Sequence, residues 1–119
     1  SYQELFDALY NDEIPHLPGA TPNGWTIKED GCYMTPYMFN GPYWFSFDAE
    51  PSLAIKAKMA NFYNLAGMSV FSADLDDFNA SFATEPYPLL RAINNALKSG
   101  ETFDPEAEPC FGTADVCEI

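Results

Sequence analysis

The order of elements after residue 42 constrains the fold of this chain most strongly. Two short apolar runs, "YWFSF" at residues 43–47 and "MSVFS" at residues 68–72, are each followed by a pattern typical of a helix. Nearly continuous apolar strands that alternate with helices indicate parallel strands buried on both faces, in an α/β sheet or barrel. Because two such strands leave both sheet edges unpaired, they cannot form a stable sheet by themselves. The sequence therefore predicts that the chain is part of a larger α/β fold.

Turn-forming residues mark the ends of the predicted elements. Pro51 fits the first turn of a helix, which we expect to continue until Gly67 provides a left-handed cap. A second helix is predicted over "YPLLRAINNALKS", with Gly100 as its stop. The aromatic runs within residues 25–48 indicate strands joined by tight turns at "DG" and "NGP".

Charge argues against two classes of partner. The chain carries 18 acidic and five basic side chains, and its formal net charge is −13. This charge repels phosphate backbones and anionic lipid headgroups, so we expect no nucleic-acid partner and no membrane partner. No run approaches the roughly 18 apolar residues of a membrane span. The chain does not begin with Met, and its start lacks the basic and apolar regions of a signal peptide. We expect an upstream part, with or without a secretion signal, that was either removed by processing or lies outside this sequence.

Three cysteines leave a choice between a disulfide and a metal site. Cys110 and Cys117 bracket "CFGTADVC" with six residues between them, whereas zinc ligands in a pair are usually about two to four residues apart. The single histidine, His16, stands alone in "EIPHLPG". We therefore expect no metal and a local disulfide between Cys110 and Cys117, which leaves Cys32 unpaired.

A set of short motifs occurs in one order along the chain. They are Pro36-Tyr37, Trp44 with Phe47-Asp48, Ser52 with Lys56, Asp74 to Phe78, and Tyr87 to Leu90. In this order they resemble the C-terminal end of the chitinases and chitinase-like proteins of glycoside hydrolase family 18. The start "SYQEL", which has the character of a helix end, resembles the Tyr-x-Glu helix of that family's small α+β insertion. The resemblance covers residues 1 to about 98.

The resemblance implies the C-terminal part of a TIM (β/α)₈ barrel, namely the last two strands and helices, together with the end of the insertion. On this basis residues 1–42 are the end of the α+β insertion, residues 43–98 are the last two β/α units, and residues 99–119 are an acidic tail. Strands one to six are then carried by an upstream chain or segment, which becomes the expected partner.

The acidic cluster "DLDD" invites comparison with the family's catalytic motif, Asp-x-x-Asp-x-Asp-x-Glu. Asp74 and Asp77 match two of its aspartates, but Asn79 and Ser81 occupy the places of the last Asp and the Glu. In the family the Glu protonates the leaving oxygen, so this cluster lacks the general acid. We expect Asp74, Asp76 and Asp77 to accept hydrogen bonds from loop amides or to pair with an arginine, with a ligand role left open.

The resemblance also implies glycan-binding residues. Family members typically end the eighth strand with a Trp that forms the floor under the sugar, and the matching residue here is Phe71. A phenyl ring keeps an apolar face but loses the area and the N–H donor of an indole. The resemblance thus implies that Phe71 lies beneath a sugar ring, with Trp44 or Asp76 nearby. The alternative is that Phe71 belongs to the core and Trp44 faces the helices.

Two further positions concern covalent bonds. By motif offset, Phe6 and Ala83 stand where many family members carry a disulfide between insertion and barrel, so that bridge is absent here. Asn79-Ala80-Ser81 is an N-glycosylation sequon, in the loop after the last predicted strand.

Three functions remain open on the sequence. The first is a secreted, extracellular chitinase-like protein that binds chito-oligosaccharides or other glycans without hydrolysing them. The second is part of an active chitinase that cleaves β-1,4-linked N-acetylglucosamine, with its acid outside this chain. The third is a structural protein that retains only the fold, since fold does not determine function. None of the three calls for a cofactor.

Overall fold

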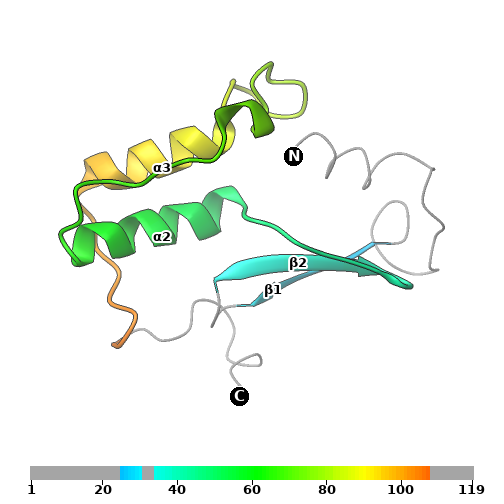
Figure 1. Cartoon of the computed structure of the whole chain (residues 1–119), viewed down its shortest axis with the longest axis horizontal. Helices are drawn as coiled ribbons and strands as arrows, with labels where there is room; N and C mark the ends of the chain where they lie inside the picture. Colours follow the sequence, from blue (N-terminus) through cyan, green and yellow to red (C-terminus); the bar gives the residue numbers. More distant parts are fainter. Residues whose placement is uncertain (1–24, 31–33, 108–119) are drawn as a thin grey trace.

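The computed structural model of this chain describes residues 25–30 and 34–107. They form a small antiparallel sheet and two long helices that lie beside each other above it (Figure 1). The expected helix at residues 1–10 and the positions of Phe6, His16 and the three cysteines lie outside the described residues. The disulfide between Cys110 and Cys117 therefore stays a prediction.

The sheet consists of strands β1 (Thr26–Asp30), β2 (Thr35–Asn40) and β3 (Tyr43–Ser46), in that order. Both pairings are antiparallel. The β2–β3 turn contains Gly41 in a left-handed conformation, with φ of +57°, where glycine carries no Cβ penalty. Side chains of β2 alternate between buried and half-buried, as expected for a strand with one face on a core. The predicted strands and the tight turn at "NGP" are confirmed.

The pairing of β3 corrects one expectation. The apolar run at residues 43–47 is not a parallel barrel strand in this structure, because Gly41 and Pro42 turn it back against β2. The expected boundary between residues 42 and 43 consequently falls inside a hairpin. Residues 68–72 do not form a strand either, and no strand in the described part of the chain pairs with them. Both runs are largely exposed in the described structure, so an apolar run alone establishes neither the burial of a segment nor its partner.

Helix α2 (Glu50–Phe62) follows the sheet directly. Pro51 occupies its first turn, as predicted. The helix ends earlier than expected, because Asn64 adopts the left-handed conformation with φ of +54°. Its amide donates to the Asn61 carbonyl and the Leu65 amide donates to the Ala60 carbonyl, which together form a Schellman motif. The prediction of a left-handed cap at Gly67 is therefore wrong.

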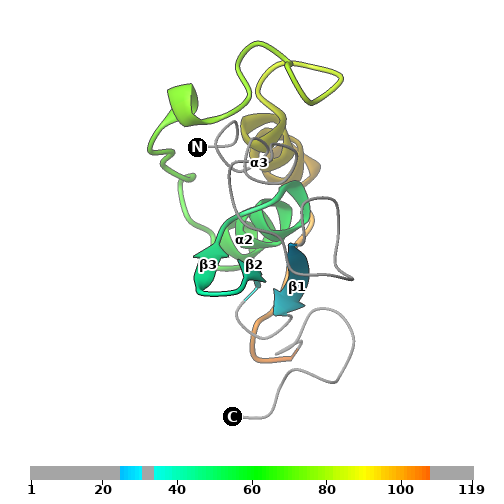
Figure 2. The ribbon, with the colours of Figure 1, turned by 90° about the vertical axis from the view of Figure 1, so that its right-hand side faces the viewer.

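Helix α3 (Pro88–Ser99) begins and ends as the sequence predicts, with Gly100 left-handed at φ of +69°. The two helices run in the same direction, and the segment between them returns along their length (Figures 1 and 2). Ala57, Ile93 and Ala96 are buried where the helices meet. The Asn61 side chain donates to the carbonyls of Ala96 and Glu101 and so joins the two C-terminal ends.

A second apolar cluster connects the helices to the sheet side of the molecule. It contains Met34, Ile55 and Phe103, with Met59 packed against it. The Phe103 amide donates to the Lys58 carbonyl at 3.2 Å. The described start of the acidic tail, residues 101–107, has no regular structure but is anchored on α2 by this side chain. Burial of a Phe side chain of this kind contributes about 2 kcal/mol.

Candidate functional site

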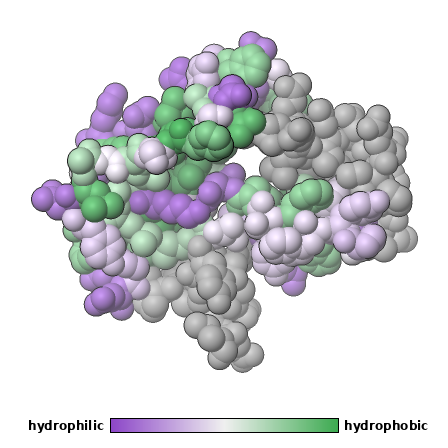
Figure 3. Space-filling model, in the orientation of Figure 1, coloured by the Kyte–Doolittle hydropathy of each residue, from purple (hydrophilic) through white to green (hydrophobic). Residues whose placement is uncertain are grey.

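The returning segment between the helices leads into a hollow beside α3. The hollow has a volume of about 280 Å³, and its lining includes Asp48, Met68, Phe71, Asp76 and Leu90. Phe71 stands on its rim with 98% of its surface exposed, so the alternative that Phe71 belongs to the core is wrong for this structure. Apolar surface gathers near the helices on the face of the molecule that Figure 3 shows. Val70 and Leu75 are also exposed.

Asp76 caps helix α3 from outside the helix. Its carboxylate oxygens accept the amides of Leu89 at 3.4 Å and Leu90 at 3.0 Å, which are the second and third residues of α3. The first amides of a helix have no partner within the helix, and a carboxylate is favoured at this end by the helix dipole. The residue that precedes the helix, Tyr87, makes no side-chain cap. Asp76 is 8% exposed and supplies the missing acceptor.

Asp77 organises the loop before α3. Its carboxylate accepts the amides of Ser81, Phe82 and Ala83 at 2.8, 3.0 and 2.9 Å. Burial raises the pKa of the Asp77 carboxyl, but these amides lower it by more, and the pKa lies below its usual value of 3.8. Asp77 therefore stays ionised near neutral pH and cannot serve as a proton donor there. Its backbone carbonyl also accepts the Tyr87 amide at 3.0 Å.

Asp76 and Asp77 thus make the backbone hydrogen bonds expected from the sequence. The third, Asp74, is exposed and accepts a hydrogen bond from the Ser72 hydroxyl instead of a loop amide. It lies in a short 3₁₀ turn, η2 (Ala73–Leu75), directly after the returning segment. Chemically, the cluster holds a loop and a helix end in place.

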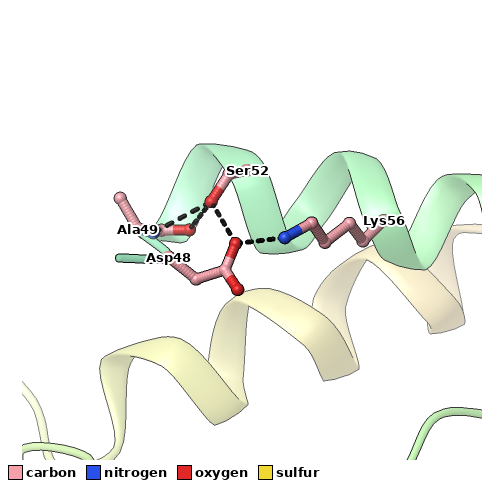
Figure 4. A network of polar contacts seen from close by, with 4 residues as sticks. All are labelled: Asp48, Ala49, Ser52 and Lys56. Atoms are coloured by element: carbon pink, nitrogen blue, oxygen red, sulfur yellow. Dashed lines mark hydrogen bonds and ion pairs between the residues drawn. The ribbon is translucent and has the colours of Figure 1, made fainter. Parts of the chain in front are cut away.

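A polar network at the start of α2 was not assigned a role from the sequence. The Lys56 ammonium lies 2.5 Å from Asp48 Oδ1, and Ser52 Oγ lies 2.9 Å from the same oxygen (Figure 4). Ser52 Oγ also accepts the Ala49 amide at 2.9 Å, which satisfies a group at the helix start. The three side chains stand four residues apart, and this spacing is the signal that could have revealed the network.

The structure brings together only part of the predicted glycan site. Phe71 and Asp76 line the same hollow. Trp44 does not line it, because it lies in β3 with its ring 5.9 Å from the Tyr37 ring and 60% of its surface exposed. Asn79 lies on the surface of the loop that Asp77 organises. The glycan-binding roles of all three predicted residues stay predictions.

Within residues 25–30 and 34–107, no three His, Cys, Asp or Glu side chains are grouped so that they could hold a metal ion. Neither helix in these ranges has the length and apolar character needed to cross a membrane.

Comparison with known proteins gives similar proteins in both sequence and structure, although no family model matches the chain. Probable chitinase 10 of Drosophila melanogaster is 38% identical over 72 residues, and Endochitinase of Brugia malayi is 35% identical over 82 residues. A crystal structure of Ostrinia furnacalis Group IV chitinase in complex with allosamidin matches 66% of this chain, with a TM-score of 0.63 and 37% identity. The chain is homologous to family 18 chitinases and chitinase-like proteins.

The homology covers a large share of this chain but a small share of the relatives. The matched region is 60% of this chain for the Drosophila protein and 68% for the Brugia protein. It corresponds to only 3% and 16% of those two proteins, and to 21% of the Ostrinia chain. The chain is therefore homologous to one region of a family 18 protein, and its fold matches part of a chitinase structure.

Proposed function

We propose that this chain is the C-terminal part of an extracellular chitinase-like protein that binds chitin or related glycans. The observation that carries the proposal is the ring of Phe71, which is 98% exposed on the rim of a hollow between packed helices. A ring that is almost fully exposed at the end of an extended segment offers an apolar face against which a sugar can stack.

The polar groups around Phe71 fit a neutral, hydroxylated ligand. Asp48 lines the same hollow, and its side chain is 37% exposed. Its second carboxylate oxygen, Oδ2, takes part in neither the Ser52 nor the Lys56 contact and can accept a hydrogen bond from a sugar hydroxyl. Both carboxylate oxygens of Asp76 accept hydrogen bonds from backbone amides. A hydrogen bond from a glycan hydroxyl to Asp76 would therefore use one of the remaining lone pairs of these oxygens.

The proposal includes completion of a barrel by an upstream segment that carries strands one to six. The support is the extended segment 68–72, which has no partner strand in the part of the chain that the structure describes. An extended segment whose backbone N–H and C=O groups lack a partner strand is a template for pairing with another strand. This chain matches only 21% of the Ostrinia chain, which supports the proposal that further strands lie outside the matched region.

A second candidate is a hydrolytic role, favoured by the names of the Drosophila and Brugia relatives. The described acidic cluster does not supply the acid, because Asp76 and Asp77 hold backbone amides. A catalytic Glu would then lie upstream. Incubating the full-length protein with chito-oligosaccharide separates the two candidates: release of shorter sugars supports the enzyme, and binding without cleavage supports the lectin-like protein.

The test of glycan binding is Phe71→Ala in the full-length protein. We expect chito-oligosaccharide binding to weaken by about 1 kcal/mol, or roughly fivefold in Kd, because one aromatic face contact is lost. The matched control is Phe62→Ala, which removes an exposed Phe from the far end of α2, outside the hollow. Equal affinity of Phe71→Ala and the unaltered protein would contradict the proposal.

A further inference from the structure

The loop after the returning segment contains the one Asn-x-Ser/Thr sequon of the 119 residues, Asn79-Ala80-Ser81. Asn79 is exposed and lies in a tight turn that the Ala80 amide closes on the Asp77 carbonyl at 3.3 Å. Its side-chain amide makes no hydrogen bond to any other described residue. The nitrogen to which a glycan would be attached is therefore accessible.

The surroundings hold this turn outward. The Asp77 carboxylate binds the amides of Ser81, Phe82 and Ala83, so the residues after Asn79 are fixed by bonds within the loop. The loop follows the end of segment 68–72, near the start of α3 (Figure 1). Strands that pair with segment 68–72 would lie along its length, whereas loops at strand ends stay on the surface. Completion of a barrel therefore leaves Asn79 accessible.

Two apolar rings flank the sequon in the same loop. Phe78 precedes Asn79 and Phe82 follows Ser81, and they are 45% and 40% exposed. We propose that Asn79 carries an N-linked glycan in the secreted protein and that its first sugar packs on the exposed ring of Phe78. The apolar CH face of a sugar packs on an aromatic face, and an attached glycan keeps an apolar surface loop soluble.

The modification is a glycosyl transfer from a polyprenyl-diphosphate-linked oligosaccharide. The Asn79 side-chain nitrogen forms a bond to C1 of the first sugar, and the bond between C1 and the diphosphate oxygen breaks. The polyprenyl diphosphate leaves with that electron pair, and the amide nitrogen loses one proton. The step involves no oxidation or reduction. The proposed glycosylation of Asn79 rests on the extracellular location in the proposed function, but not on glycan binding at Phe71.

The experiment uses the full-length protein, secreted from eukaryotic cells behind an added secretion leader, which ensures its entry into the secretory route. Trypsin releases the peptide from Met59 to Arg91, and enzymatic deglycosylation in heavy-oxygen water converts glycosylated Asn79 to labelled Asp. We expect the label in the unaltered protein and in Ser81→Thr, and none in Ser81→Ala. All three retain the residue 81 amide that binds Asp77.

The outcomes are distinct. Unlabelled Asn79 in both the unaltered protein and Ser81→Thr overturns the modification. A hydrophobic fluorescent dye should bind Ser81→Ala more than Ser81→Thr, because the Phe78 ring is then uncovered, and equal dye binding overturns the covering by sugar. Chito-oligosaccharide binding is measured on the same samples, so a failure of the sequon and a failure of the glycan site at Phe71 are seen separately.

Discussion

The extended segment 68–72 and the loop 76–88 that follows it differ in how their polar groups find partners. In the loop, Asp76 and Asp77 accept amides from the loop itself and from the start of α3. In the segment, Phe71 and its neighbours face solvent, and no described strand pairs with them. The loop is therefore stabilised by hydrogen bonds within the described chain, whereas no described strand supplies such bonds to the segment.

The largest expected effect comes from removing the carboxylates of the loop. In the full-length protein, Asp76→Ala leaves the Leu89 and Leu90 amides without their acceptor and should cost about 1–3 kcal/mol in the free energy of unfolding. Asp77→Ala removes three such bonds and should destabilise more. Denaturant unfolding measures both. Asp74→Ala is the exposed control, and its free energy of unfolding should stay within about 0.5 kcal/mol of that of the unaltered protein. Similar losses in all three variants would show that the Asp76 and Asp77 carboxylates do not stabilise the loop specifically.

Asn64 is the residue at which the chain leaves α2 toward the segment. Asn64→Ala places an alanine at φ of +54° and should destabilise by about 1 kcal/mol, whereas Asn64→Gly should not. Gly67→Ala is the matched control, because Gly67 is not left-handed and an added Cβ would meet nothing within 4 Å. Thermal unfolding of these three variants and the unaltered protein measures the differences in stability. A larger loss at Gly67 than at Asn64 would return the helix cap to Gly67.

The loop should also respond to acid in a defined direction. The pKa of Asp77 is lowered in the folded protein from 3.8, so its stabilising effect is complete above that pH and disappears as the pH falls through the lower, folded value. The stability difference between the unaltered protein and Asp77→Asn should therefore be constant near neutral pH and shrink below about pH 4. A difference that grows on acidification would show that the sign is wrong.

The smallest effect is expected at the network beside the hollow. Lys56→Met removes the ion pair with Asp48, whose side chains are about one-third exposed, and should change stability by less than about 1 kcal/mol. Ser52→Ala removes the acceptor of the Ala49 amide and should cost a similar amount or slightly more. Urea unfolding of both variants provides the check; a loss above 3 kcal/mol for Lys56→Met would make this pair central to the fold.

The sequence predicted features that depend on neighbouring residues. Pro51 and Gly100 mark helix ends through backbone preferences that act locally, and the turn at Gly41 joins two strands as expected. Features that depend on contacts between residues far apart in the sequence were harder to predict. Asn64 ended α2 before Gly67 because either residue tolerates the left-handed conformation, and the pattern of "YWFSF" did not reveal an antiparallel partner.

The candidate site shows the same division. Phe71 was singled out through a family resemblance, and its exposure on the rim of a hollow agrees with a site. Trp44 or Asp76 was expected near Phe71. Asp76 lines the same hollow, whereas the hairpin places the Trp44 ring on the sheet, tilted against the Tyr37 ring at 5.9 Å. Asp48 lies just before α2, and Ser52 and Lys56 follow it at intervals of four residues, which brings the three side chains together. Hydrophobic periodicity does not reveal contacts between polar residues.

The most direct test of the central claim is amide hydrogen exchange in the full-length protein, resolved for residues 69–72. If strands from outside the described residues pair with this segment, its amides should exchange as slowly as those of Ile93 and Ala96 in the buried face of α3. The amides of Ser81, Phe82 and Ala83 provide an internal reference for bonds made within the loop. Slow exchange at residues 69–72 is the predicted result. Exchange at the rate of an unpaired surface segment, with α3 still protected, would contradict it.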